Sequence, residues 1–300
     1  MFAVISPSEP DAAPAGKLPG KRRAPHGAEA AAAPLQRSVG SVDLVISRGS
    51  NGSRVTRAFQ QGSMKVRFPN VATGDPPEAV LINTSGGLTG GDLQQIAVTV
   101  AAEAAAVVTT QACERIYRSS GDDARIAVHL TVGAGANLHW LPQPLIFFDG
   151  GRLKRETHVE LSSNANFLAV ESVVFGRLAS GETVKHGVVS DAWFVRRAGR
   201  LIHAERFAAD GAIDSILGKP AMLAGNRAMA LVRYIASDVE SRLQHMRALL
   251  EDCACDAAAS AWNGMLLARL HAPDAYALNR GLTAVLSGFR GTPLPKAWLL

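Results

Sequence analysis

A glycine-rich segment holds the residues of this chain most suited to contact an ion or a partner. Residues 81–92 have the sequence LINTSGGLTGGD, with the glycines Gly86, Gly87, Gly90 and Gly91 just before Asp92. Bare backbone amides can cradle an anion. A phosphate loop of the Walker type, however, continues with Lys and then Ser or Thr, whereas here an aspartate follows. Two interpretations remain: a tight turn between strands that needs positive φ, or a place where a partner or ion approaches exposed backbone beside Asp92.

Three other segments combine polar and aromatic side chains. Residues 109–118 (TTQACERIYR) suit a sheet edge, and residues 140–148 (WLPQPLIFF) suit core packing at a sheet corner or, less readily, an exposed partner ledge. Glu171 precedes residues 175–182 (FGRLASGE), in which Gly176 and Gly181 bracket a turn that Arg177 and Glu182 could close by pairing. Such a surface ion pair contributes little to stability.

The residues arranged for catalysis or tight metal binding are few. The chain has no Gly-x-Ser-x-Gly elbow and no His-Glu-x-x-His pair, and its acidic residues come singly in the β region. Cys253-Ala254-Cys255 is spaced more tightly than common zinc knuckles and is interpreted as an incidental loop. The eight histidines form no i, i+4 pair, and His129 and His158 fall on polar strand faces. These patterns do not indicate an enzyme.

Composition narrows the class of protein further. The 300 residues are 47% hydrophobic and 19% charged, which is typical of a globular chain. The net charge of +5 is scattered, without a basic stripe or an aromatic platform, so we expect no nucleic-acid binding. No segment is typical of a membrane span, and three cysteines are too few for a disulfide framework. We expect a cytoplasmic protein.

The hydrophobic pattern predicts the elements that position these segments. Residues 1–38, rich in Ala, Pro and Gly, are predicted to be a disordered extension. Period-two alternation then predicts at least ten short strands, which leave no room for crossover helices. The sheets should therefore be largely antiparallel or wound as a solenoid. The predicted strands are 42–47, 80–83, 95–100, 107–111, 125–132, 138–141, 157–161, 167–174, 184–189, 193–195 and 201–207.

The last quarter of the chain has a different period. Val239, Leu243, Met246 and Leu250 are spaced 4, 3, 4 after a Ser237…Glu240 capping box, which predicts a helix near 238–251. A second helix is predicted near 273–290, ending at Gly291, with a strand over 264–271 between the two helices. Residues 39–300 thus form one mainly β domain of stacked, β-helix-like sheets with two C-terminal α-helices.

Six blocks in order resemble the UreD (UreH) family of urease accessory proteins. They are RFPN (67–70); Asn83 with GGLTGGD (86–92); TTQ (109–111) with Arg115, Ile116, Tyr117 and Arg118; WLPQP (140–144); FGR (175–177) with Gly181 and Glu182; and PKAW (295–298). The resemblance covers about residues 40–298. Cys113-Glu114 and Lys296 depart modestly from the family's usual residues, and Cys253-Ala254-Cys255 belongs to none of its motifs.

The resemblance implies a non-enzymatic chaperone with a β-rich fold. Family members bind apo-urease and the accessory protein UreF, which carries the GTPase UreG, and the assembly delivers Ni²⁺ to urease. No cofactor is then expected to be tightly bound, and Ni²⁺ is in transit. The alternative is a β-rich interaction scaffold unrelated to urease.

Physical chemistry constrains how such a protein would handle nickel. A relay needs several weak polar sites in a hydrated passage, because a tight cage would retain the ion. We expect Asp92 and Glu182 to contribute carboxylates to the passage, with Thr84, Ser85 and Gln111 as neutral lining. We also expect residues 237–298 to help dock UreF.

Overall fold

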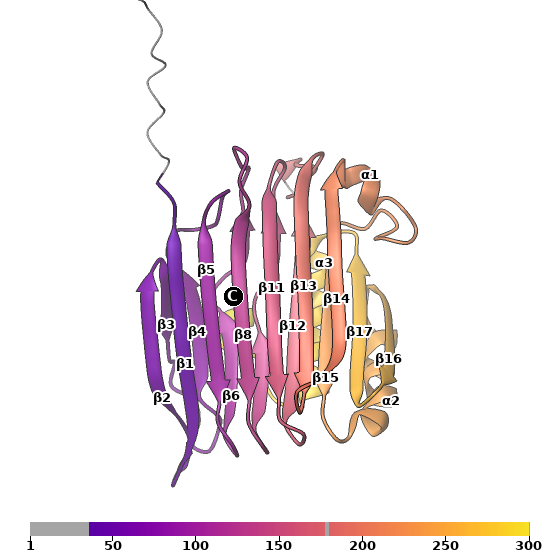
Figure 1. The fold of residues 1–300 in the computed structure, drawn as a ribbon. Coiled ribbons are helices and arrows are strands. Elements are labelled where there is room, and N and C mark those ends of the chain that lie inside the picture. The colour runs from indigo at the N-terminus through magenta and orange to yellow at the C-terminus, as the bar shows by residue number, and fades with distance from the viewer. Residues whose placement is uncertain (1–35, 178–179, 300) are drawn as a thin grey trace, which may run out of the picture. The chain divides into compact units, whose positions relative to one another are not determined.

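Two β-sheets face each other across an apolar core, and helices cover the outer face of one of them (Figure 1). The computed structural model describes residues 36–177 and 180–299. Apart from its last three residues, the predicted extension over residues 1–38 lies outside the described residues. The architecture confirms the mainly β fold with C-terminal helices that the sequence predicts.

Sheet A has seven strands. In spatial order they are β14 (Arg200–Gly211), β13 (Gly187–Arg197), β11 (Arg152–Leu161), β8 (Ala124–Val132), β5 (Leu93–Val100), β1 (Val39–Gly49) and β2 (Gly52–Gly62).

Sheet B has ten strands. Its main path is β16 (Asp256–Trp262), β17 (Met265–Ala272), β15 (Ala228–Ile235), β12 (Asn166–Phe175), β9 (Asn137–Leu141), β6 (Ala105–Thr110), β4 (Glu78–Asn83) and β3 (Met64–Arg67). Two short strands lie off this path. Strand β10 (Leu145–Phe147) pairs with β12 on one side and with β7 (Glu114–Ile116) on the other.

The chain winds between the sheets like a solenoid. From β4 to β13 it alternates between sheet B and sheet A, apart from the short sheet B strands β7 and β10. The central pairs β5–β8, β8–β11 and β11–β13, and likewise β4–β6, β6–β9 and β9–β12, are therefore parallel. Antiparallel pairs flank this region, as in β1–β2 and β13–β14 of sheet A and in β12–β15 and β15–β17 of sheet B. Of the two arrangements that the sequence left open, the solenoid describes the centre of the molecule.

Two apolar layers explain the burial pattern of the strands. Inward residues of β8, among them Ile126, Val128 and Leu130, are buried between the sheets while their neighbours face outward, as period two requires. Strand β12 is covered on both faces, by sheet A on one side and by the helical layer on the other. It therefore has a nearly continuous apolar sequence, interrupted by Glu171 and Ser172.

The C-terminal helices match the predicted segments. Helix α2 spans Val239–Glu251 and helix α3 spans Ala275–Arg290, and the periodic set Leu278, Leu282, Val285 and Phe289 is buried. Gly291 ends α3 in the left-handed conformation, φ 65°. Helix α1 (Ile213–Leu217) is short and was not predicted.

The predicted capping box of α2 is wrong. Asp238, not Ser237, is the N-cap of this helix, and no side chain caps its free N–H groups. The Asp238 carboxylate instead accepts a hydrogen bond from the Tyr234 hydroxyl (2.7 Å). A tertiary contact with β15 therefore takes the side chain that a local cap would use.

Sequence periodicity missed six strands of the described chain, of which β3, β7 and β10 are only three or four residues long. Strand β2 is exposed along most of its length, β15 is buried on both faces, and β16 is mostly alanine, so none of them alternates clearly. The predicted strand 184–189 overlaps the start of β13, and the predicted strand 193–195 lies within that same strand. No helix among the described residues has the length and apolarity needed to cross a bilayer.

Candidate functional site

A cavity of about 210 Å³ lies between the two sheets. Inward residues of β5, β8, β11 and β13 line it on the sheet A side, and residues of β4, β6, β9 and β12 line it on the sheet B side. Apolar walls such as Ile96, Val128 and Trp140 alternate with a polar lining of Asn83, Gln94, Thr110, Gln111, Glu114, Arg155, Thr157, Glu171 and Ser172. The exposed residues Gly86, Gln111 and Ala112 belong to the same lining, so the cavity reaches the surface beside them.

Glu114 lies where the cavity approaches that surface. Its carboxylate accepts hydrogen bonds from Gln94 Nε2 (2.8 Å) and Asn83 Nδ2 (3.1 Å) and from the Arg115 amide (3.0 Å). Burial raises the pKa of Glu114, while these hydrogen bonds oppose the rise. Neutral amides from β4 and β5 thus hold the carboxylate in place, and the nearby Arg115 charge also opposes the rise in its pKa.

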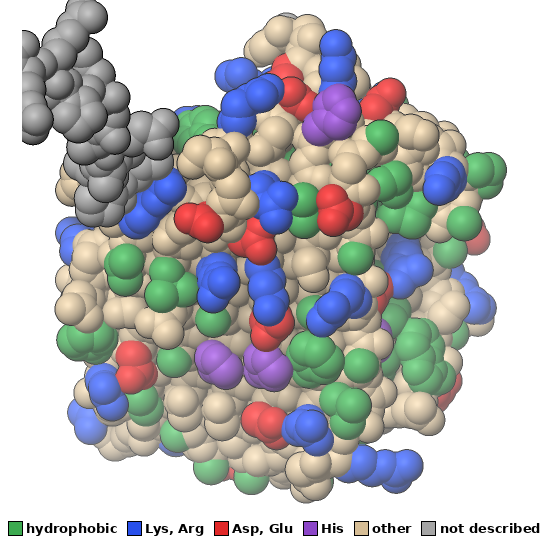
Figure 2. Space-filling view, turned by 45° about the horizontal axis from the view of Figure 1, so that its top comes forward, with side chains coloured by type: hydrophobic (Ala, Val, Ile, Leu, Met, Phe, Trp, Pro, Cys, Tyr) green, Lys and Arg blue, Asp and Glu red, His purple; other side chains and the backbone are tan. Residues whose placement is uncertain are grey.

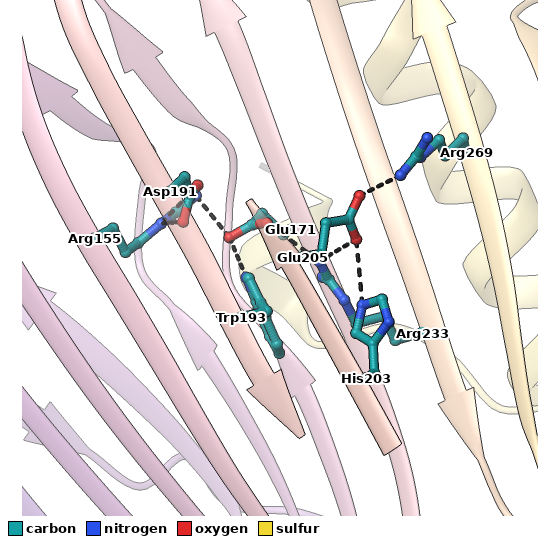
Figure 3. A network of polar contacts seen from close by, with 8 residues as sticks. All are labelled: Arg155, Glu171, Asp191, Trp193, His203, Glu205, Arg233 and Arg269. Atoms are coloured by element: carbon teal, nitrogen blue, oxygen red, sulfur yellow. Dashed lines mark hydrogen bonds and ion pairs between the residues drawn. The ribbon is translucent and has the colours of Figure 1, made fainter. Parts of the chain in front are cut away.

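Deeper in the cavity, Glu171 belongs to a dense ionic cluster (Figure 3). Arg155 Nη2 lies 2.8 Å from Glu171 Oε1, and Arg155 Nε lies 3.0 Å from each Asp191 oxygen. Trp193 Nε1 donates to Glu171 Oε1 at 2.6 Å. Burial first, and the neighbouring Asp191 charge second, raise the pKa of Glu171 to about 7. The Glu171 carboxyl therefore gains and loses its proton near neutral pH.

The ionic cluster continues from the cavity wall toward the surface. Arg233 is fully buried, with Nη2 lying 3.6 Å from Glu171 Oε2 and 3.2 Å from Glu205 Oε2, and its guanidinium stacks on Trp193 at 4.0 Å. Glu205 also pairs with the exposed Arg269 and lies 3.3 Å from His203 Nε2. Three carboxylates thus face three guanidiniums (Figure 3). The cluster extends from Arg155 and Glu171, which line the cavity, to the exposed Arg269 on β17.

This arrangement suits transient contact with a cation better than permanent binding. Among the described residues no three His, Cys, Asp or Glu side chains are grouped to hold a metal ion. A divalent cation in the cavity would meet separate oxygen ligands from Glu114, Gln111 and Thr110, which are hard, exchangeable donors. Arg155 and Arg233 would repel it at the inner end.

The two carboxylates expected in the passage are not among the residues that line the cavity. Asp92 is buried and accepts hydrogen bonds from the backbone amides of Ser38 (2.7 Å) and Thr89 (2.8 Å), so it closes the glycine-rich turn. Glu182 pairs with Arg177 at 3.0 Å and lines a separate surface depression with residues such as Tyr117 and Arg118.

Of the neutral residues expected to line the passage, the structure brings only Gln111 to the cavity. The Thr84 hydroxyl donates to the Ser63 carbonyl (2.9 Å), and Ser85 bonds to Asn83 at the exposed rim of the turn. Short polar side chains in turns commonly satisfy nearby backbone in this way.

The structure identifies interior residues that were not assigned from sequence. Glu114 and Glu171 stand within the motifs quoted above, but Arg155, Asp191 and Arg233 stand in no motif. The available signal was a charged residue inside an apolar strand, as in Val170-Glu171-Ser172-Val173 and Val232-Arg233-Tyr234. Such residues are rarely buried without partners.

The motif blocks that lie far apart in sequence meet around the glycine-rich turn. Gly87 has a φ of 150°, and a side chain there would collide with the Tyr117 ring, which stacks on Phe148 with centroids 5.1 Å apart. Arg118 pairs with Asp149 at 2.6 Å.

Two other pairs of blocks meet in the same way. The Arg177 guanidinium lies 4.7 Å from the Phe148 ring centre. The Trp298 indole donates a hydrogen bond to the Leu141 carbonyl at 3.0 Å, which links block 295–298 to block 140–144.

Comparison with known proteins identifies the family. The family described as "UreD urease accessory protein" matches residues 38–299. The chain is 46% identical over 265 residues to the urease accessory protein UreD of Azorhizobium caulinodans, covering 88% of this chain and 97% of that protein. The UreD proteins of Brucella suis (45%; 89% and 96% covered) and Xanthobacter autotrophicus (43%; 88% and 90%) are similar over the same extent. The chain belongs to the UreD urease accessory protein family.

Proposed function

We propose that this protein is a non-enzymatic chaperone of urease maturation. It would act in the cytoplasm, bind apo-urease and the UreF–UreG accessory proteins, and help deliver Ni²⁺ to the urease active site. Membership of the UreD family supports the role in maturation. The single observation that supports a nickel passage is the polar cavity between the sheets, which reaches from the exposed Gln111 to Glu171 in the interior.

In this proposal Glu114 is the carboxylate that Ni²⁺ meets in transit. It is the cavity carboxylate held by amides alone, whereas Glu171 is already neutralised by Arg155 and Arg233. One carboxylate with amide and hydroxyl oxygens binds a divalent cation weakly, and weak binding lets the ion leave.

The test compares the nickel content of urease matured with variants of this protein. Glu114→Gln keeps the size of the side chain and removes its charge, and we expect it to lower the nickel bound per urease while UreF and urease still co-purify. Glu182→Gln, outside the cavity, is the matched control and should leave nickel loading unchanged. Full loading with Glu114→Gln would contradict the passage, and full loading in cells that lack the protein would contradict the maturation role.

We further propose that the C-terminal region, residues 237–298, helps to dock UreF. Deleting it would strip strands β16 and β17 from sheet B and expose the second apolar layer, so surface substitutions test the idea better. Tyr276 on α3 is 71% exposed and lies 5.6 Å from the Arg280 guanidinium, an aromatic and arginine pair of the kind enriched in interfaces. Tyr276→Ser should weaken UreF capture, whereas Phe59→Ser on the distant strand β2 should not, and equal capture by both would argue against this docking face.

A further inference from the structure

Two histidines lie side by side on the outer face of sheet A. His129 of β8 and His158 of β11 are direct partners in the parallel register of these strands. Their rings stack with centroids 5.3 Å apart and an interplanar angle of 10°. Figure 2 shows two adjoining histidine side chains on this open face.

This pair is separated from the cavity by the thickness of the sheet. Val128 and Thr157, the residues immediately before the two histidines, line the cavity on the inner side. Because successive side chains of a strand point to opposite faces, His129 and His158 point away from it. Sheet register, and not a sequence motif, brings the two imidazoles together.

The neighbouring side chains give the pair a defined shape. Phe194 of β13 is the register partner of His158 on its other side and stacks on that ring at 5.1 Å, which restricts the ring on one side. His129 is exposed to solvent. Glu156, two residues before His158 on the same strand face, places Oε2 3.9 Å from His158 Nε2.

We propose that His129 and His158 form a binding site for a late first-row divalent cation such as Ni²⁺, Cu²⁺ or Zn²⁺. Neutral imidazole is a preferred ligand of these ions. A turn of the His129 ring would present its nitrogen beside that of His158, with water completing the coordination. Two imidazoles on a solvent-exposed sheet form an open, exchangeable site. The proposal does not depend on the interior passage, because no residue of the pair lines the cavity.

The experiment is a calorimetric titration of the purified full-length protein with NiCl₂. Loss of only an outer-shell partner of a metal ligand commonly weakens binding by about 10–100-fold. We therefore expect His129→Gln and His158→Gln each to weaken the site at least about tenfold, and the double variant to abolish it. His245→Gln, which removes an exposed histidine from α2, is the matched control and should bind like the unchanged protein.

A second measurement locates the ion directly. Substoichiometric Ni²⁺, which is paramagnetic when coordinated by imidazole and water, should broaden the ring-proton NMR signals of His129 and His158 before that of His245. Unchanged affinity in the double variant, or broadening that spares both rings, would overturn the proposal. Nickel loading of urease with Glu114→Gln reports on the interior passage, whereas the ring-proton signals of His129 and His158 report on this site, so failure of the interior passage and failure of this site give different results.

Discussion

Replacing Arg233 by methionine tests whether the buried ionic cluster stabilises the sandwich of sheets. The Arg233 side chain is 1% exposed and lies between the Glu171 and Glu205 carboxylates, 3.6 and 3.2 Å away. Methionine occupies similar space against the Trp193 ring but carries no charge. The substitution therefore leaves the packing largely filled and removes one of the three guanidiniums that balance three carboxylates.

The expected loss can be worked out from the partners that remain. Removing one member of a buried ion pair costs about 3–5 kcal/mol. Glu171 keeps Arg155 and Glu205 keeps Arg269, so we expect the lower limit, about 3 kcal/mol. With an unfolding entropy of about 2.1 cal/mol/K per residue, a folded unit as long as Arg37–Leu300 would lose about 5 °C in Tm.

Thermal unfolding followed by circular dichroism measures this change, with Arg269→Met as the control. The Arg269 side chain pairs with the same Glu205 but is 59% exposed. Solvent screens such a pair, so its loss should cost less than about 1 kcal/mol. A second variant, Arg233→Met with Glu171→Gln, should recover part of the lost stability because it removes the unbalanced charge. If Arg233→Met and Arg269→Met unfold at the same temperature, burial of the cluster does not add to the stability of the fold.

Three further predictions concern the cluster and the glycine-rich turn. Because the pKa of Glu171 is raised to about 7, the folded state keeps a proton that the unfolded state loses. The free energy of unfolding should therefore fall as pH rises from about 4.5 to 7. Denaturant titrations across this range should show a smaller fall for Glu171→Gln. Gly87→Ala should destabilise the protein more than Gly86→Ala, by about 1–3 kcal/mol, because both have positive φ but only position 87 would collide with Tyr117; equal melting temperatures would contradict this. Asp92→Ala should cost about 1–3 kcal/mol by leaving two backbone amides without their acceptor, whereas Glu182→Ala, which breaks a pair with the half-exposed Arg177, should cost less than about 1 kcal/mol in the same melts.

The candidate site was less predictable from sequence than the fold. Asp92 and Glu182 are carboxylates on glycine-flanked turns, which favours them as ion contacts in the sequence. A turn also needs acceptors for its own backbone amides, however, and Asp92 serves that need. The interior carboxylates Glu114 and Glu171 lie in strands, where no local pattern shows which residues face them. Their partners come from strands 16 to 62 residues away in the chain, such as Arg155 and Arg233 for Glu171.

The amino-acid sequence by itself determined the class of structure. The period-two alternation of apolar residues specifies the strands, the 4, 3, 4 spacing of apolar residues specifies helix α3, and Gly291 ends that helix. These features depend only on neighbours within a few residues. The tertiary structure alone decided which strands became parallel neighbours, and with them the cavity, the charge balance around Glu171 and the stacked pair His129 and His158. The physical reason is that register between distant strands is selected by burial over the whole sheet, which no short stretch of sequence contains.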